Sequence, residues 1–298
     1  MSLVSTKQLL EDAYQNHYAI GAFGAHNLEI MKAIIAGAEE MGSPVILQTT
    51  PGTIKYVGIE YMKAMAESAA KQAKVPVALH LDHGDSFDIV MKCLRAGYTS
   101  VMIDGSHLAL EDNIALVKKV TEVAHLLDVP VEAELGTIGG VEDDLVVNEE
   151  EVVYTDPKMA EFFVKQTGID SFAPAFGTAH GMYKKEPNLQ FDLLKEINER
   201  VACPIVMHGA SGIADDAVQK ALDYGVSKVN FSTELKLIYA KELRQYFSEH
   251  SEEDDPRKYF VPGTEAVKAL VKEKITVLQS KSKGLRYDYN NHTQSSIR

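Results

Sequence analysis

Histidines and carboxylates recur in this sequence where short apolar runs end. His83 and His208 each close a run rich in Val, Ile, Leu or Met, and His180 follows another run by a few residues. Three protein ligands leave a coordination position on a divalent ion open for water or substrate, and imidazole suits zinc or a similar transition metal. Glu134 and Asp104 end two further runs with carboxylates. Taken singly, His83 and His208 are as well explained by a hydrogen bond at a strand end, but the three histidines together favour a catalytic metal site.

Two glycine-containing segments give a second signal. Residues 177–181 (Gly-Thr-Ala-His-Gly) and 208–212 (His-Gly-Ala-Ser-Gly) place small residues beside candidate ligands, so main-chain N–H groups can approach an anion closely. The second segment comes just before a predicted helix, whose N-terminus favours phosphate. Residues 230–233 (Asn-Phe-Ser-Thr) add further donors. Either loop alone is explained by a tight turn, but beside the histidines they indicate a phosphate site.

The elements that must position these groups alternate along the chain. Val, Ile and Ala fill eight short runs without clean polar alternation, as expected of parallel strands buried on both faces. The predicted strands are residues 19–23, 45–49, 77–82, 100–104, 131–135, 171–176, 204–208 and 228–232. The predicted helices are residues 28–41, 61–73, 87–96, 110–127, 157–166, 191–199, 215–224 and 233–250.

Eight such units predict one closed (β/α)8 TIM barrel with an extra C-terminal helix over residues 261–278. An open doubly wound sheet would require a Gly-x-Gly-x-x-Gly turn after an early strand, and the sequence has none. In a barrel, all the polar strand ends meet at the C-terminal rim, where such barrels carry their active sites. We assign residues 1–279 to the barrel and expect residues 280–298 to form a mobile polar tail.

A long acidic connection at residues 137–155 interrupts the alternation, and connections of this length are often lids or binding loops. The net charge of −13 over 298 residues argues against a nucleic-acid or anionic-membrane binder. Two cysteines are too few for a disulfide framework, and residues 1–15 lack the apolar run of a signal peptide. We therefore expect a cytoplasmic protein.

At these residues the chain resembles the zinc-dependent class II ketose-bisphosphate aldolases, over residues 3–279. The motifs that carry the resemblance are residues 79–84 (LHLDHG), 102–107 (MIDGSH), 131–136 (VEAELG), 177–181, 208–212 and 228–230 (KVN). The resemblance implies reversible aldol cleavage of a ketose 1,6-bisphosphate, of fructose or tagatose, to dihydroxyacetone phosphate and glyceraldehyde 3-phosphate.

The resemblance also implies a metal-ligand set. Zinc, for which cobalt can substitute, would be held by His83, His180 and His208. Glu134 and Asp104 match carboxylates that approach a second or alternative metal position. A metal of this kind stabilises the negative charge of the enediolate, so no Schiff-base lysine is required. Lys228 is the only lysine in the eight runs, and we place it at a strand start, away from the active rim.

Two carboxylates match acid/base residues of the family. Asp82 corresponds to the group that exchanges a proton with the C4 oxygen, and Glu142 to a loop carboxylate that exchanges a proton at the dihydroxyacetone phosphate carbon. Adjacent strand residues point to opposite sides, so Asp82 and His83 can face one site only where the strand ends. We therefore expect His83 to turn onto the metal at the rim while Asp82 faces the C4 hydroxyl.

The remaining matches concern substrate and partners. Gly181, Gly209, Ser211, Asn230 and Thr233 match dihydroxyacetone phosphate contacts, often assisted by a monovalent cation such as Na⁺ or K⁺. The candidate substrate-binding set also includes Thr50, Ala210, Phe231, Ser232 and Arg257, and Asn230 is a catalytic candidate as well. Arg257 matches an arginine that reaches the other phosphate across a subunit boundary, which implies a homodimer or homotetramer.

Two features leave the substrate open. Gly24 stands where many relatives have asparagine, and the remaining motifs mix features of fructose- and tagatose-bisphosphate enzymes. The alternatives are an aldolase for another phosphorylated sugar or sugar acid, and a non-catalytic metal- or phosphate-binding subunit. Asp82 beside three histidines speaks against the second alternative, because binding alone needs no acid/base. His26 and His107 lie in loops at the same rim without an assigned role, and His80 shares the strand parity of Asp82.

Overall fold

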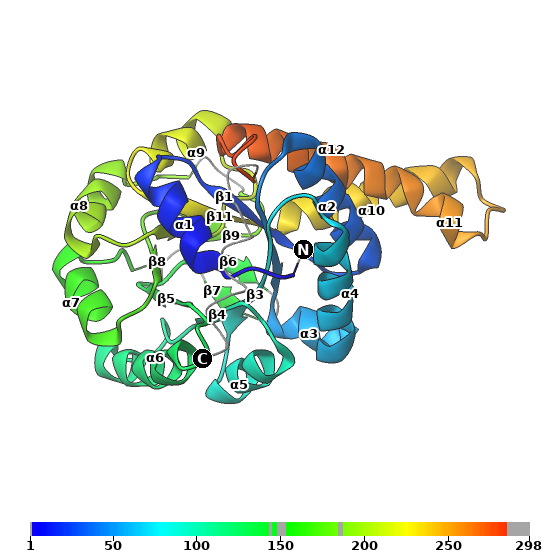
Figure 1. The fold of residues 1–298 in the computed structure, drawn as a ribbon. Coiled ribbons are helices and arrows are strands. Elements are labelled where there is room, and N and C mark those ends of the chain that lie inside the picture. Colours follow the sequence, from blue (N-terminus) through cyan, green and yellow to red (C-terminus); the bar gives the residue numbers. More distant parts are fainter. Residues whose placement is uncertain (1, 143–144, 148–152, 184–186, 285–298) are drawn as a thin grey trace.

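Eight parallel strands form a closed barrel surrounded by helices (Figure 1). The computed structural model describes residues 2–142, 145–147, 153–183 and 187–284. The barrel strands are β1 (Ile20–Gly24), β2 (Val45–Thr49), β3 (Val77–Gly84), β4 (Ser100–Ile103), β5 (Val131–Leu135), β8 (Ser171–Pro174), β10 (Ile205–Met207) and β11 (Val226–Phe231). Their order around the barrel is β1-β11-β10-β8-β5-β4-β3-β2. The predicted (β/α)8 barrel is confirmed.

The barrel closes between its first and last strands, where Ile20 pairs with Lys228. Almost every residue of the eight strands is buried, which explains why their sequences show no polar alternation. The inner side chains meet inside the barrel, and the outer ones pack against the helices. The C-terminal ends of all eight strands therefore share one rim.

The surrounding helices match the predicted pattern. They are α2 (Leu28–Met41), α4 (Ile59–Gln72), α5 (Phe87–Ala96), α6 (Leu110–His125), α7 (Pro157–Thr167), α8 (Phe191–Val201), α9 (Asp215–Leu222), α10 (Thr233–Glu249) and α12 (Val261–Val277). Asp156 caps α7 by accepting hydrogen bonds from two main-chain N–H groups, with Pro157 at the first helical position. Gly97 and Gly168 end α5 and α7 in the left-handed conformation.

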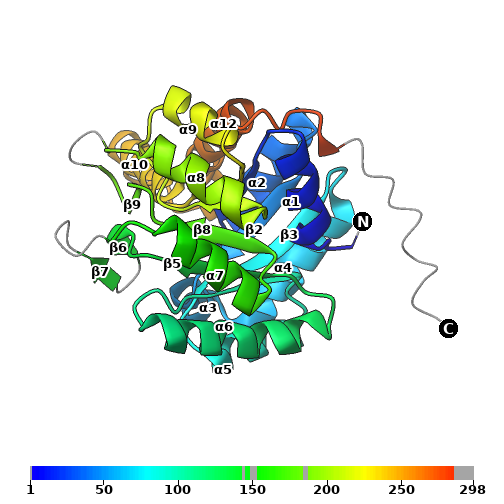
Figure 2. The ribbon, with the colours of Figure 1, turned by 90° about the vertical axis from the view of Figure 1, so that its left-hand side faces the viewer.

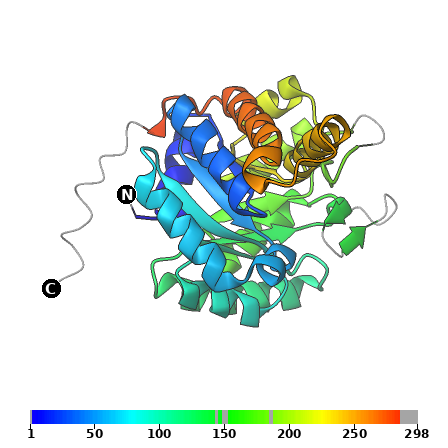
Figure 3. The same ribbon diagram turned by 90° about the vertical axis from the view of Figure 1, so that its right-hand side faces the viewer.

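Three helices were not predicted from the sequence. They are α1 (Thr6–Gln15), α3 (Pro51–Val57) and α11 (Pro256–Tyr259). The start of α1 is marked by Ser5, whose hydroxyl accepts from the N–H of Lys7, and its buried face includes Leu9 and Leu10. Figures 2 and 3 show α1 at one end of the barrel, opposite the end that carries β6 and β7.

The long connection after β5 contains a hairpin of β6 (Gly139–Glu142) and β7 (Leu145–Val147). β6 also pairs in parallel with β9 (Ala179–His180), which brings Gly140 opposite His180. Gly140 has φ +104°, and a Cβ there would overlap the main chain of His180. Only glycine adopts this conformation so close to another backbone, so the Gly139-Gly140 pair ties the hairpin to the segment that carries His180.

The helices α10 and α12, with α11 between them, extend as an arm beyond the barrel (Figure 1). The segment assigned to the C-terminal tail begins packed against the barrel, where Ser280 is buried and its hydroxyl accepts from Ser43, 2.9 Å away. The Gly284 N–H donates to the carbonyl of Gly42 at 2.9 Å. Residues 285–298 lie outside the described part of the chain. Among the described residues, none of the helices combines the length and the hydrophobicity that a membrane span requires.

Candidate active site

Three histidines from three segments meet at the C-terminal rim. His83 ends β3, His180 lies in β9 and His208 follows β10. The centroid of the His83 ring lies 5.0 Å from that of His180 and 4.7 Å from that of His208. The His180 and His208 centroids are 5.9 Å apart. One nitrogen from each ring lies within 4.8 Å of the others. This spacing suits three ligands around one ion, and Asp104 and Glu134 form a second such group with His83.

Neighbouring carboxylates orient two of the rings. Asp104 Oδ2 lies 2.8 Å from His83 Nδ1, and Glu132 Oε1 lies 2.9 Å from His208 Nε2. The opposite nitrogen of His208, Nδ1, is buried without a hydrogen bond and lies 3.1 Å from Glu134 Oε2. Metal-ligating histidines commonly donate their second ring N–H to a carboxylate, as His83 can to Asp104 and His208 to Glu132. The donor set and the open His208 Nδ1 therefore fit a divalent transition-metal ion.

The backbone at the end of β3 explains how two adjacent side chains reach one site. His83 has φ +45°, and the pairing of β3 with β4 shifts register between Leu81 and Gly84. A shift of this kind redirects side chains and is frequent beside active sites. At His83 the backbone leaves regular strand geometry, as the sequence predicted.

Asp82 directly precedes His83 and is fully buried, with a carboxylate oxygen within 4.8 Å of ligand atoms of His80 and Glu132. Its Oδ1 accepts a hydrogen bond from the Asn230 amide at 3.0 Å, whereas Oδ2 has no hydrogen-bond partner. Asn230 therefore fixes the orientation of the carboxylate, and one oxygen remains available. A buried carboxylate with a fixed orientation and one open oxygen can act as a general acid/base.

The charges around the triad are strongly coupled. Burial opposes ionisation of Asp104, but hydrogen bonding and charge interaction with His83 outweigh it and lower the pKa of Asp104. Burial likewise opposes ionisation of Glu132, but Lys228, His80 and His208 hold its pKa well below the usual range. Burial lowers the pKa of His208, but the close carboxylates of Glu132 and Glu134 outweigh this and raise it to about 9. The carboxylates of Asp104 and Glu132 are therefore ionised at neutral pH.

A polar pocket adjoins the triad at the N-terminus of α10. Its lining includes six of the predicted substrate-binding residues, together with three residues that were not in that set. The six are Gly181, Gly209, Ser211, Asn230, Ser232 and Thr233, and the three are Gln48, His180 and Lys236. Main-chain N–H groups at a helix N-terminus, with an ammonium group nearby, suit a phosphate. Gly209 has φ +62°, and a Cβ there would overlap the main chain of Ala179, so the close approach of the two loops requires glycine.

Other predicted residues do not line this pocket. Thr50 is buried, and its hydroxyl caps α3 by accepting a hydrogen bond from the main-chain N–H of Thr53. Ala210 and Phe231 are buried in the core. Phe231 stacks on Phe23 with a centroid distance of 5.7 Å. The structure describes the main chain of Glu142, at the end of β6, but not its side chain.

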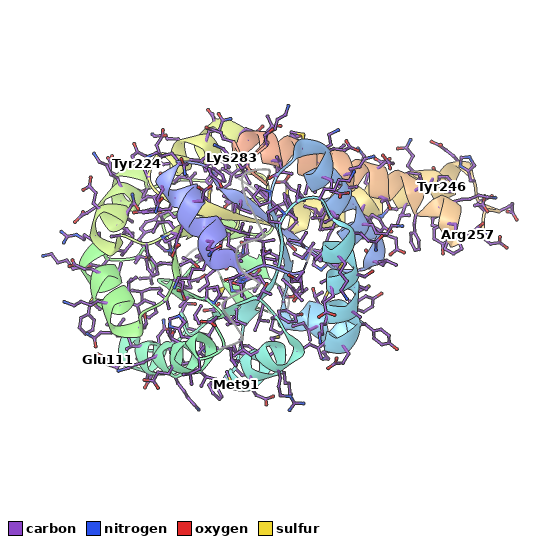
Figure 4. All side chains as sticks on the ribbon, viewed as in Figure 1. Met91, Glu111, Tyr224, Tyr246, Arg257 and Lys283 are labelled. Carbon is purple, nitrogen blue, oxygen red and sulfur yellow. The ribbon has the colours of Figure 1, made fainter. Side chains whose placement is uncertain are left out.

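Arg257 lies far from its own rim. It stands at the tip of the arm with 88% of its side chain exposed, and it pairs with Asp255 at 2.9 Å (Figure 4). Of the two unassigned histidines, His107 is exposed, while His26 lies at the rim within 3.1 Å of Ser232 and 3.0 Å of Thr53. A Cβ at Gly24 would lie 2.7 Å from both His26 and Ser232, so these two side chains fill the space beside Gly24.

The family model for fructose-bisphosphate aldolase class-II matches residues 4–283. The chain belongs to this family. The YdjI aldolase from Escherichia coli K12 is 35% identical, with a TM-score of 0.83 over 95% of this chain and 99% of that one. A putative fructose-1,6-biphosphate aldolase from Coccidioides immitis is 32% identical, with a TM-score of 0.84 over 93% and 97% of the two chains. Campylobacter jejuni fructose-bisphosphate aldolase, at 24% identity and a TM-score of 0.78 over 95% and 97%, shares the fold.

Several polar residues of the candidate site were not predicted from the sequence. Gln48 is a buried amide in an otherwise apolar strand, which is a signal the sequence contained. Lys236 lies one turn into α10, on the side of Ser232 and Thr233, where helical spacing could have placed it. Lys228 is not at a strand start, because β11 begins at Val226, and its ammonium group is buried inside the barrel.

Proposed function

We propose that this class II aldolase reversibly cleaves a ketose 1,6-bisphosphate to dihydroxyacetone phosphate and glyceraldehyde 3-phosphate. The observation that carries the proposal is the open Oδ2 of buried Asp82, which directly precedes His83 of the histidine triad and is held by Asn230 of the polar pocket. A site for phosphate binding alone would not require a buried carboxylate held by Asn230 beside the histidines.

His83, His180 and His208 would hold a zinc ion, and Asp104 and Glu134 would serve a second or alternative metal position. When bound, zinc acts as a Lewis acid that stabilises negative charge on the substrate oxygens, and cobalt can replace it. Asp104 and Glu132 keep the two rings they contact in fixed orientations.

The chain's own residues carry the proton transfers. In cleavage, Asp82 accepts the proton of the C4 hydroxyl, the C3–C4 bond breaks, and the aldehyde forms at C4. The electron pair of that bond passes to the C2 carbonyl as an enediolate, and Glu142 returns a proton to C3. In condensation Asp82 gives its proton back to the new hydroxyl, so it must act in both protonation states.

The pocket at α10 would bind the phosphate of the dihydroxyacetone part. Gly181, Gly209 and Ser211 supply donors from two loops, Thr233 supplies the helix N-terminus, and Lys236 supplies positive charge. A monovalent cation, Na⁺ or K⁺, would lie near this phosphate. Fructose and tagatose bisphosphates differ only in configuration at C4, beside Asp82.

Arg257 would complete the site of a neighbouring subunit by binding the second phosphate. Its exposed guanidinium group at the tip of the arm lies away from its own rim (Figure 4). This arrangement supports a homodimer or homotetramer, in which the arm reaches the next barrel.

A second candidate function is cleavage of another phosphorylated sugar or sugar acid. The observation that favours it is the space beside Gly24, which His26 and Ser232 fill in this chain. That arrangement places an imidazole and a hydroxyl where many relatives carry an asparagine amide.

A coupled assay for triose phosphate release tests the proposal. Rates are compared for fructose and tagatose 1,6-bisphosphates and a panel of phosphorylated sugars, before and after chelation and after addition of zinc or cobalt. We expect cleavage of a bisphosphate that chelation abolishes and metal restores. Full activity in verified metal-free protein, or trapping of substrate on the chain by borohydride, would exclude this mechanism.

A further inference from the structure

We propose that Lys228 is a positioning residue that holds Glu132 against His208 and so determines which ring nitrogen of His208 faces the metal position. The inference rests on the metal site of the proposed function. Lys228 and Glu132 lie in a layer of the barrel below the residues that face substrate.

Lys228 and Glu132 form an ion pair inside the barrel. Both residues are buried, Lys228 with 0% and Glu132 with 1% of its surface exposed. The ammonium nitrogen lies 3.0 Å from Glu132 Oε1 and 2.8 Å from Oε2, so it contacts both carboxylate oxygens. A lysine is almost never fully buried unless its charge is paired, and this one spans from β11 to β5.

The same carboxylate contacts His208. Oε1 of Glu132 accepts from Lys228 and lies 2.9 Å from His208 Nε2. A metal ion binds a deprotonated ring nitrogen, and with the remaining proton on Nε2 the lone pair lies on Nδ1, which has no hydrogen bond and lies 3.1 Å from Glu134 Oε2. A carboxylate at Nε2 therefore selects the form of His208 that can ligate a metal through Nδ1.

Further contacts fix the ammonium group in place. Its nitrogen lies 3.2 Å from His80 Nε2, and His80 Nδ1 lies 2.8 Å from Ser100 Oγ, which accepts from Thr6 at 2.9 Å. His80, Asp82 and Glu132 have the composition of a metal site, with ligand atoms within 4.8 Å of one another. The Lys228 ammonium contacts two of these three residues, so it supplies the positive charge that this group would otherwise take from an ion.

Amide substitution at Glu132 separates positioning from simple packing. In Glu132→Gln, the NH₂ group meets the Lys228 ammonium whichever way the amide lies, because the lysine contacts both oxygen positions. The conflict disturbs the amide oxygen that should accept from His208. In Lys228→Met/Glu132→Gln the conflict is gone, so the amide oxygen can again face Nε2.

Metal binding gives the decisive measurement. Metal-free wild-type, Glu132→Gln, Lys228→Met and double variants are titrated with Co²⁺ against a competing chelator, and the visible absorption bands are recorded. We expect Glu132→Gln to lower the Co²⁺ affinity by about 10–100-fold, the usual effect of a lost outer-sphere partner, with altered bands. The double variant should bind Co²⁺ several-fold more tightly than Glu132→Gln, although a residue has been removed.

Lys274→Met is the matched control. Lys274 is also buried and ion-paired, to Glu234 at 3.2 Å, but it lies on α12 outside the barrel. Its loss should lower stability and leave Co²⁺ affinity unchanged. Lys228→Met removes the ammonium group that pairs with the buried Glu132 carboxylate, so this single variant can fail to fold. The double variant removes both charges, and its comparison with Glu132→Gln still tests the proposal in that case.

The outcomes distinguish the inference from the function on which it rests. If wild-type protein does not bind Co²⁺, the proposed metal site is wrong. If wild-type protein binds Co²⁺ but the folded double variant binds it no more tightly than Glu132→Gln, the positioning role of Lys228 is overturned. Equal affinities in wild type and Glu132→Gln would overturn it as well.

Discussion

Two layers of polar side chains inside the barrel differ in how their hydrogen bonds are satisfied. At the rim, several buried atoms have no hydrogen-bond partner: Asp82 Oδ2, Asn230 Oδ1, Gln48 Oε1, and the neighbouring atoms Glu134 Oε2 and His208 Nδ1. One layer deeper, Lys228, Glu132, His80, Ser100 and Thr6 contact one another in a continuous chain. Buried polar groups in native proteins are nearly always paired, so the open atoms mark the groups kept for something that binds.

The contrast separates the two kinds of effect that a substitution can have. An unsatisfied buried group costs about 1–3 kcal/mol in stability, so the rim is destabilising by itself. The paired layer below supports it with ionic and hydrogen bonds between strands. Changes at the rim should therefore alter activity, and changes in the deeper layer should alter stability or the orientation of the groups above.

The largest effect is expected for His83→Ala. Loss of one of three histidines should remove the metal and reduce cleavage to the level of metal-free protein. Metal content and cleavage rate of the purified variant are measured together. Normal metal content in a folded variant would show that His83 is not a ligand.

Asp82→Ala should separate proton transfer from metal binding. We expect the variant to retain its metal and to bind dihydroxyacetone phosphate, while cleavage falls by about 10²–10⁴-fold, the usual contribution of a general acid/base. Metal analysis, ligand titration and steady-state rates test this. A metal-free variant, or one with a near wild-type rate, would make Asp82 a ligand or a bystander.

Asn230→Ala removes the donor that orients the Asp82 carboxylate. A hydrogen bond to a charged group contributes about 1.5–3 kcal/mol, which corresponds to a loss of roughly 10–100-fold in kcat/KM. Asn230 also lines the polar pocket, so we expect KM to rise in addition to the fall in kcat. An unchanged kcat would argue that Asp82 does not depend on this contact.

Arg257→Ala tests a residue that lies outside both layers. Loss of a charge-assisted phosphate contact should raise KM for the bisphosphate by about tenfold and change kcat little. Mixing this variant with Asp82→Ala should restore some wild-type sites if subunits exchange. Demonstrated exchange without any recovered activity would place Arg257 outside the neighbour's site.

The smallest effect on catalysis is expected for Ser100→Ala, in the deeper layer. The substitution leaves His80 Nδ1 and the Thr6 hydroxyl without their shared partner, which should lower the free energy of unfolding by about 1–3 kcal/mol. Denaturant unfolding measures this, and kcat/KM should stay within about twofold of wild type. A large loss of activity at unchanged stability would mean that the two layers are not separable in this way.

Local patterns were sufficient to predict the barrel and the residues at its rim. Uninterrupted apolar runs identified the strands, and the polar residues at their ends identified the rim, because a parallel barrel brings all carboxyl ends together. The bend at His83 followed from the need for two adjacent side chains to face one site. These arguments need only sequence neighbours and the strand period.

The deeper layer could not be predicted in the same way. The contacts of Lys228 with Glu132 and His80 join three strands, and a lysine in a strand gives no indication of its partner. Helix α1 was missed because its role, closing the barrel end, depends on residues far away in the chain. Gln48 was missed because one amide in an apolar strand is as readily explained by a local hydrogen bond.

Closure of the barrel between β1 and β11 has a consequence for how the protein folds. The pairing of Ile20 with Lys228 joins residues separated by nearly the whole barrel sequence, and contacts at such separation form slowly. The ion pair of Lys228 with Glu132 crosses the same closed space, so it forms only once β11 has joined the other strands. On a ribosome, the first seven strands emerge before β11 is made. Until then the sheet is incomplete, and its edge strands have unpaired main-chain groups that can associate with other chains.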